Sequence, residues 1–272
     1  MRPHGTPDAV RVPQGKRVTA ATNAAAYPLK RPFDVLVATA VLLLSLPLTL
    51  LALGVVCLCD LNSPLYVSER IGCQGRPFRF LKIRTMVPQA SASTVDTTVA
   101  GDRRVTIAGG WIRALKLDEL PQLLHVLTGR MSMVGPRPNV PREVALYTAE
   151  ERGLLAARPG ITDIASIVFA DLGRALGNAP DPDIAYNQLV RPWKSRLGLH
   201  YMSCASLGND LRIIGYTVSV LFARRWTLRR ISALLARTGA PTELCRFVLR
   251  EEPLRPLPPP GADDIVTSRS LE

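Results

Sequence analysis

The sequence predicts an α+β protein that is mostly helical, with an N-terminal membrane segment joined to a compact cytoplasmic domain. An uncharged apolar block runs from Val35 to Cys59. Residues then alternate on both sides of a Gly72–Gly75 turn, which predicts a small β-hairpin. Further on, Leu117, Leu120, Leu124 and Leu127 recur at helical spacing. We expect a flexible basic tail over 1–27, the membrane segment over 28–60, the compact domain over 61–222, a basic amphipathic helical region over 223–250 and a disordered proline-rich tail over 251–272.

The composition calls for an anionic partner. The formal net charge is +12, which favours nucleic acid, anionic lipid or a phosphorylated substrate. Aromatic residues are scarce and are not interleaved with the basic clusters, so we expect no nucleic acid. The five cysteines follow no metal-ligand spacing and their number is odd, which fits a reducing cytoplasmic setting. The isolated histidines receive no catalytic role.

The apolar block is long enough to cross a bilayer, at roughly 25 residues. However, Ser45 and Pro47 lie near its middle, where a proline removes a backbone hydrogen bond and kinks a helix. Basic residues also flank both ends, which the positive-inside rule associates with a cytoplasmic location of both ends. We therefore predict a re-entrant membrane helix, helix–break–helix, and keep a kinked single-pass helix as the alternative.

The predicted hairpin carries two cations. In its second strand Phe78, Phe80, Lys82 and Arg84 share one face by the period of two. The cations are either a solvated surface or a clamp for an anion. The following residues, 87–107, have no apolar period and are predicted to form a loop.

Two adjacent carboxylates, Asp118 and Glu119, open the next helical pattern. Pro121 is tolerated only in a first helical turn, so the helix is expected to begin near Asp118. The acids then lie at the positive end of the helix dipole, where phosphate is also favoured. A capping aspartate followed by a first-turn glutamate is the ordinary structural explanation of the same pair.

Two rigid turns follow in the second half. Pro136 and Pro138 flank Arg137 and stiffen its backbone, so less entropy is lost when the guanidinium binds a ligand. A second turn follows at 158–163. Residues 171–195 are polar and proline-rich and are interpreted as loop. From Leu211 onward, apolar and arginine residues mix, which predicts basic amphipathic helices on an anionic membrane surface.

Taken together, the ordered motifs resemble one family, the bacterial sugar transferases, which are monotopic polyprenyl-phosphate phosphoglycosyl transferases. The resemblance covers about residues 28–222 and implies that the compact domain over 61–222 is the phosphoglycosyl transferase catalytic domain. It rests on the apolar block with Ser45–Pro47, Ser63-Pro64, Arg70-Ile71-Gly72, Lys82-Ile83-Arg84-Thr85-Met86, Leu117-Asp118-Glu119-Leu120-Pro121-Gln122, Met131-Ser132-Met133-Val134-Gly135-Pro136-Arg137-Pro138 and Arg158-Pro159-Gly160-Ile161-Thr162.

The resemblance implies transfer of a sugar-1-phosphate from a UDP-sugar to undecaprenyl phosphate, with release of UMP, among the lipids of the bacterial inner membrane at its cytoplasmic face. It implies Asp118 as the nucleophile that forms a covalent phosphosugar–aspartyl intermediate and Glu119 as its acidic neighbour, with Mg²⁺ held by both. Lys82, Arg84, Arg113 and Arg137 match the family's basic positions. The role of Glu119 stays open between metal binding, orientation of Asp118 and proton transfer, and a homodimer also stays open.

Several positions depart from the family pattern, among them Gly109-Gly110, Lys116, Asp163-Ile164-Ala165-Ser166-Ile167, Gly198 and His200. These changes bear on the sugar and its contacts rather than on the nucleophile. Three alternatives remain at this stage: a diphosphate hydrolase using the same aspartyl chemistry, a catalytically silent scaffold of a glycan-assembly complex, and a membrane-tethered nucleic-acid binder.

Overall fold

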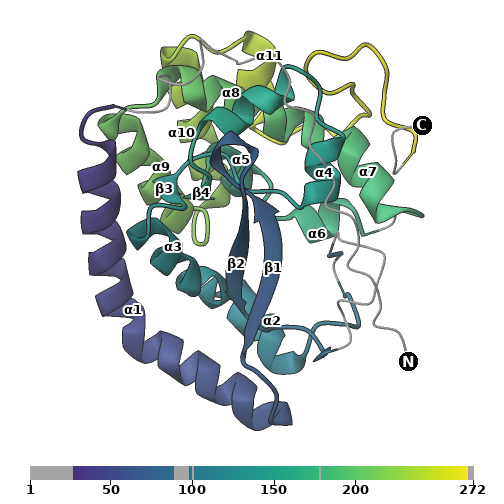
Figure 1. The fold of residues 1–272 in the computed structure, drawn as a ribbon. Helices are drawn as coiled ribbons and strands as arrows, with labels where there is room; N and C mark the ends of the chain where they lie inside the picture. The colour runs from purple at the N-terminus through teal and green to yellow at the C-terminus, as the bar shows by residue number, and fades with distance from the viewer. Residues whose placement is uncertain (1–26, 89–97, 100, 178, 269–272) are drawn as a thin grey trace, which may run out of the picture.

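The computed structural model describes residues 27–88, 98–99, 101–177 and 179–268 (Figure 1). Apart from Tyr27, the predicted basic tail lies outside this part of the chain. The elements in order are α1 (Lys30–Asp60), β1 (Leu65–Ile71), η1 (Cys73–Gly75), β2 (Pro77–Ile83), α2 (Ile107–Ala114), η3 (Leu117–Gln122), α3 (Leu123–Leu127), β3 (Ser132–Val134), α4 (Pro141–Ala145), η4 (Glu151–Ala156), β4 (Gly160–Thr162), α5 (Ile164–Val168), α6 (Leu172–Ala175), α7 (Pro182–Leu189), α8 (Arg191–Cys204), α9 (Leu207–Ser219), α10 (Arg224–Arg237) and α11 (Thr242–Phe247). The prediction of a mostly helical α+β protein is confirmed.

Helix α1 is continuous, although Pro47 lies inside it. It runs down one side of the molecule, bends and continues beneath the hairpin (Figure 1). Proline has no N–H to donate and its ring crowds the carbonyl one turn earlier, which bends a helix without having to interrupt it. Thr49 Oγ1 donates to Ser45 O at 2.9 Å beside the proline. The predicted helix–break–helix is therefore corrected to one bent helix.

One side of α1 packs against the rest of the protein along the whole helix. Asp34, Ala38, Ala52 and Val56 are buried on this side. The opposite side exposes large apolar side chains, with Leu44 at 86% and Leu58 at 78%. In the described residues, Lys30–Cys59 is one helix long and apolar enough to cross a membrane.

The predicted hairpin is confirmed. β1 and β2 pair antiparallel from Leu65–Ile83 to Ile71–Pro77, and η1 forms the connection where the Gly72–Gly75 turn was expected. Within the turn, Gly75 has a φ of 73°, a left-handed conformation that glycine adopts without strain. A second sheet was not predicted. It consists of β3 (Ser132–Val134) and β4 (Gly160–Thr162), which pair in parallel. Strands this short show no alternation in the sequence.

The backbone comes into close contact beside this second sheet, between Gly135, which directly follows β3, and Gly160, the first residue of β4. A Cβ on Gly160 would lie 2.2 Å from the backbone nitrogen of Gly135, which no side chain tolerates. Gly135 N donates to Thr162 O at 3.1 Å, and Gly160 N donates to Pro136 O at 3.0 Å. The two proline-bearing turns seen in the sequence are thus fastened to each other, and Arg137 lies directly after this contact.

The stretch 171–195, which was predicted to be loop, contains α6, α7 and the start of α8. Asp181 caps α7 by accepting from Asp183 N and Ile184 N at 3.0 and 3.2 Å. Pro182 and Pro192 each lie at the start of a helix, where the missing N–H is not needed. The prolines that we interpreted as loop formers are helix starters, so the prediction for this stretch is wrong.

The core continues past residue 222. Leu228, Ile231 and Leu235 of α10 are buried in the main hydrophobic cluster together with Val168 and Leu197. These side chains of α10 are therefore packed within the protein, whereas Trp226 at its start is 52% exposed. The basic amphipathic helix expected over 223–250 is present, and the membrane contact expected from Leu211 onward stays a prediction, because Leu211 and Phe222 remain exposed. No separate core begins at the boundary predicted at 222.

Residues 251–268 form no helix or strand, yet they are packed. Leu254 and Leu257 pack against the main cluster. Arg196 donates to Pro258 O at 3.2 Å, and Gln188 Nε2 donates to Val266 O at 2.8 Å. The prediction of a disordered tail does not hold for these residues, because prolines that exclude regular structure still leave carbonyls free to accept side-chain hydrogen bonds.

Candidate active site

The two carboxylates lie in the tight turn η3 that connects α2 to α3. Lys116, just before it, has a φ of 58°, and Glu119 N donates to Lys116 O at 3.3 Å. Pro121 lies inside this 3₁₀ turn, and the α-helix proper begins only at Leu123. The helical segment therefore begins where it was predicted, but its first turn is of the tighter kind. Neither acid is the capping residue, so the simple capping explanation does not hold.

A lysine from the hairpin bridges both acids. Lys82 Nζ lies 3.3 Å from Asp118 Oδ2 and 3.1 Å from Glu119 Oε1. The strand that carries it is tied to α3, because Leu81 N donates to His125 Nε2 at 3.2 Å. This position resolves the choice left open by the sequence for Lys82, which points into a partly buried anionic cluster rather than to bulk solvent.

An arginine from the rigid turn completes the cluster. Arg137 Nη1 donates to Glu119 Oε2 at 3.1 Å and to Ile161 O at 3.0 Å, and Nη2 donates to Glu119 Oε1. Its backbone N donates to Asp163 Oδ2 at 3.3 Å. Both ends of Arg137 are therefore held by residues just after the Gly135–Gly160 contact. Asp163 was named in the sequence only as a departure from the family pattern and not as a site residue, and its place at the end of the second rigid turn was the available signal.

Arg113 and Arg84 are placed differently. Arg113 Nε donates to Thr85 Oγ1 at 2.7 Å, and Arg84 Nε donates to Ser63 O at 2.7 Å near the base of the hairpin. Burial lowers the pKa of Arg113, opposed by the charges of Asp118 and Asp102. Arg113 thus lies within electrostatic range of the acids. Arg84 follows the last residue of β2, so strand alternation does not fix its direction.

The electrostatics keep Glu119 ionised. Burial alone would raise its pKa, but the charges of Arg137 and Lys82 outweigh burial and hold the pKa well below its usual range. Conversely, burial would lower the pKa of Arg137, and Glu119 more than compensates, so that pKa is raised. Glu119 and Arg137 therefore form a permanently charged pair beside Asp118, whose side chain is 8% exposed.

The two acids suit a metal ion that is bound jointly with the substrate phosphates rather than one enclosed by protein ligands. In the ranges that the structure describes, no group of three or more His, Cys, Asp or Glu could hold a metal. Mg²⁺ commonly takes one or two carboxylates together with substrate phosphates and water. Asp118 and Glu119 fit that donor set. Arg137 and Lys82 already contact both oxygens of Glu119, whereas only Lys82 contacts Asp118, through Oδ2 alone.

The first turn of α1 is fastened to the strand that leads into Arg137. Lys30 Nζ donates to Val134 O at 2.8 Å and to Asp210, and Tyr201 OH donates to the same carbonyl at 3.2 Å. Asp34 Oδ1 accepts from Met133 N at 3.0 Å. The membrane segment and the Arg137 turn are therefore parts of one rigid assembly.

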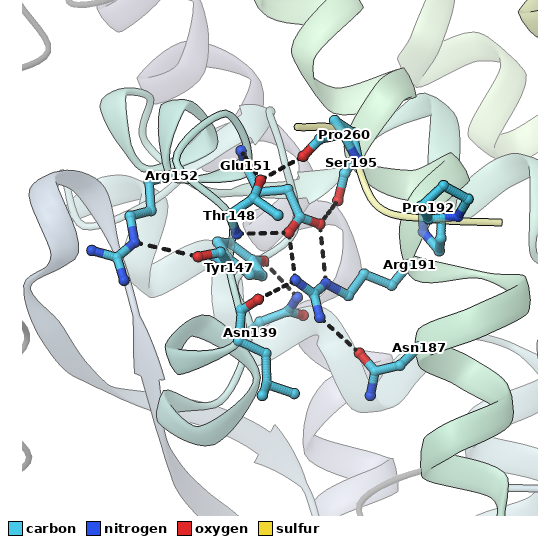
Figure 2. Close-up of polar contacts among 12 residues, drawn as sticks. Asn139, Tyr147, Thr148, Glu151, Arg152, Asn187, Arg191, Pro192, Ser195 and Pro260 are labelled. Carbon is cyan, nitrogen blue, oxygen red and sulfur yellow. Dashed lines mark hydrogen bonds and ion pairs between the residues drawn. The ribbon is translucent and has the colours of Figure 1, made fainter. Parts of the chain in front are cut away.

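A second buried ionic cluster borders a cavity that Arg137 also lines, and Figure 2 shows its contacts. Arg191 Nε donates to Glu151 Oε1 at 3.0 Å, its Nη2 pairs with Glu151 Oε2, and its Nη1 donates to Asn187 Oδ1 at 3.1 Å. Ser195 donates to Glu151 at 2.7 Å. Each charge is neutralised inside the protein, so this cluster joins α7 and α8 to η4 and is structural.

Comparison with known proteins gives the family. A profile of bacterial sugar transferases matches residues 25–224, most of the chain. The chain belongs to the bacterial sugar transferase family. It is therefore an enzyme, a phosphoglycosyl transferase, and the resemblance seen in the ordered motifs is confirmed.

Individual relatives of this transferase carry informative names. It is 36% identical over 211 residues to the exopolysaccharide production protein ExoY of Sinorhizobium fredii, covering 72% of this chain and 86% of the relative. It is 36% identical over 197 residues to a UDP-glucose:undecaprenyl-phosphate glucose-1-phosphate transferase of Caulobacter vibrioides, covering 71% and 69%. It is 33% identical over 213 residues to a UDP-galactose-lipid carrier transferase of Erwinia amylovora, of which it spans 41%.

Proposed function

We propose that this transferase moves a sugar-1-phosphate from a UDP-sugar to undecaprenyl phosphate and releases UMP. The step would start the assembly of a lipid-linked glycan. The observation that carries the proposal is the cluster of Asp118 and Glu119 with Lys82 and Arg137: Lys82 bridges the two acids, and Arg137 pairs with Glu119. The names of the relatives from Caulobacter vibrioides and Erwinia amylovora supply the class of donor and acceptor.

In the first half-reaction we assign the nucleophile to Asp118. A carboxylate oxygen attacks the phosphorus that bears the sugar, an oxygen–phosphorus bond forms, and the bond to the bridging oxygen breaks. The electron pair leaves on UMP, which needs no proton. In the second half-reaction a phosphate oxygen of undecaprenyl phosphate attacks the same phosphorus and restores the free carboxylate. Glu119 does not take the nucleophile's place in this scheme, because Arg137 and Lys82 already hold its oxygens.

The two cations offset the repulsion between the anionic nucleophile and the diphosphate of the donor. An anionic nucleophile approaching a diphosphate is repelled unless fixed positive charge lies nearby. Lys82 and Arg137 are held in place before substrate arrives, so no reorganisation is needed at the moment of reaction. Mg²⁺ held by Asp118 and Glu119 together with substrate phosphates would add Lewis-acid charge neutralisation.

Contacts of α1 support the re-entrant arrangement at the cytoplasmic face of the inner membrane. Arg31, in its first turn, donates to the carbonyl of Leu127 at 2.9 Å. Near its other end, Val56 packs with Ile83 and Ile112 of the catalytic body. A helix of about 20 residues is needed to cross the hydrocarbon core, and a straight span would carry its far end away from that body. The apolar outer face of α1, Trp111 on α2 and Phe222 after α9 are exposed and suit contact with lipid.

The reaction is tested with the purified full-length protein in lipid nanodiscs. UDP-sugars of several kinds are supplied with Mg²⁺, with and without undecaprenyl phosphate, and UMP is measured. We expect UMP release that depends on the lipid phosphate, and a sugar-phosphate adduct on the protein when the lipid is omitted. Lipid-independent release of sugar-1-phosphate would instead indicate the diphosphate hydrolase. A well-folded protein with neither activity nor adduct would indicate the scaffold.

A further inference from the structure

A small cavity lies behind Arg137, on the side of the Glu151–Arg191 cluster. Its volume is about 30 Å³, and its lining residues include Arg137, Tyr186, Lys194 and Asp163. A water molecule needs roughly 10–15 Å³ of such space, so the cavity admits about two water-sized atoms. That is enough for the free oxygens of one phosphate group and too little for a nucleoside.

Lys194 brings a positive charge to this cavity, where the charges of Asp163 and Glu143 act on it without forming an ion pair. Its ammonium lies 5.1 Å from the ring centre of Tyr186 and 5.9 Å from that of Phe169. Within the described ranges, its Nζ makes no hydrogen bond and no ion pair. The neighbouring Arg191 differs, because Glu151 and Asn187 occupy all three of its nitrogens (Figure 2).

The hydroxyl of Tyr186 is a second polar group of the same kind. Tyr186 lines the cavity, and its hydroxyl makes no hydrogen bond with a residue that the structure describes. Both residues are half-buried, so their two donors are not enclosed by protein and are available to bind a ligand that enters the cavity. An ammonium and a phenol hydroxyl together suit an anionic oxygen.

We propose that Lys194 and Tyr186 form an anion subsite for the phosphate of the donor that leaves as UMP. The inference rests on the proposed function. Arg137 links the two places, because its side chain holds Glu119 beside Asp118 and the residue also lines the cavity. A phosphate next to the one under attack would then meet Lys194, whose charge offsets the negative charge that develops on the departing UMP.

The protonation of Lys194 provides a pH signature. Burial lowers its pKa to about 8, with Asp163 acting to raise it. The charged and titratable groups around the lysine are Asp163, Arg137, Glu143, Tyr186 and Arg191. The ammonium form predominates below pH 8 and is lost above it, so phosphate affinity should fall as the pH rises through about 8.

The test compares binding of UMP with binding of uridine, which lacks the phosphate, by calorimetry on the full-length protein. For Lys194→Met we expect UMP affinity to fall by about tenfold to a hundredfold while uridine affinity is unchanged. Lys194→Arg should retain UMP affinity and keep it at pH 9.5, where the wild type has lost it. Arg237→Met, at an exposed arginine in the last turn of α10, is the matched control and should bind UMP normally.

The outcomes separate cleanly. Unchanged UMP affinity in Lys194→Met, or an equal loss of UMP and uridine binding, would overturn the subsite. So would a wild-type UMP affinity that is flat between pH 7 and 9.5. Because binding is measured without turnover, the subsite can be judged even if the wild type releases no UMP with undecaprenyl phosphate, a result that would refute only the proposed reaction.

Discussion

Asp118 is buried enough to be shielded and is bridged by one lysine, which keeps an oxygen directed into a cationic environment. We expect Asp118→Asn to lower UMP release by roughly a thousandfold or more and to abolish the sugar-phosphate adduct, because an amide is a poor nucleophile toward phosphorus. UMP release and intact-protein mass spectrometry measure both. Asp264→Asn, the same chemical change at an exposed aspartate, should behave as the wild type. Near-normal turnover by Asp118→Asn would remove this residue as the nucleophile.

Arg137 makes a forked contact with Glu119 and a further bond to Ile161 O. We expect Arg137→Ala to lower kcat/KM for the UDP-sugar by about tenfold to a hundredfold and also to lower the unfolding temperature, since a charged carboxylate is left without its partner. Arg137→Lys keeps the positive charge but cannot make the two-pronged contact, so its kcat/KM and unfolding temperature should lie between those of the wild type and Arg137→Ala. Steady-state kinetics and thermal unfolding check this. Kinetics equal to the wild type in both variants would restrict Arg137 to a structural role.

Glu119 has a pKa held below its usual range in the folded protein. A carboxylate of this kind stabilises the fold fully above the pKa of the unfolded chain, about 4.3, and loses that contribution as the pH falls toward the folded pKa. The stability difference between wild type and Glu119→Gln should thus be constant from pH 8 to about 5.5 and shrink below pH 4. Thermal unfolding in detergent at these pH values gives the difference. A stability difference that grows as the pH falls would show that the pKa of Glu119 is not lowered in the folded protein.

Among the elements, α1 shows most clearly how one residue sets the geometry, because Pro47 lies inside this bent helix (Figure 1). Pro47→Ala removes a helix-interior penalty of about 3 kcal/mol and should straighten α1, which would separate Val56 from Ile83 and Ile112. A single cysteine placed at residue 63, in a cysteine-free protein, reports the result. We expect it to resist a membrane-impermeant reagent in intact cells in the native sequence and to react in Pro47→Ala. Leu44→Ala, on the exposed side, is the control. Labelling from outside without the Pro47 change would exclude the re-entrant arrangement.

The elements also show where periodicity serves and where it does not. The hairpin was predictable because seven paired residues on each strand alternate around a glycine turn. β3 and β4 were not, because they pair through three residues each and owe their position to the Gly135–Gly160 contact. The prolines at 182 and 192 show that a proline marks a helix start as readily as a loop, and the capping Asp181 was the signal that distinguishes them.

At the scale of the whole molecule, residues 251–268 close over α7, α8 and residue 148. Thr148 Oγ1 donates to Pro260 O at 2.5 Å, and Leu257 N donates to Gln188 O at 3.0 Å. Deleting 251–272 exposes the surface beneath Leu254 and Leu257, which should lower the free energy of unfolding by about 1–3 kcal/mol. We expect a fall in the unfolding temperature of roughly 3–8 °C, seen in thermal unfolding. Deletion of 269–272 alone is the control. An unchanged unfolding temperature for the longer deletion would mean that this segment is not packed in solution.

The sequence by itself determined the order of the motifs, the hairpin, the apolar helix with its proline, and the residue types of the site. These follow from local chemistry: charge, periodicity and the missing N–H of proline. Only the tertiary structure decided that Lys82 and Arg137, which lie 55 positions apart in the chain, meet at Glu119. It alone decided that Lys194 faces the Arg137 turn and that Leu228, Ile231 and Leu235 of α10 are buried. Such partnerships depend on which surfaces pack together, and that choice is made by the whole core rather than by any one segment.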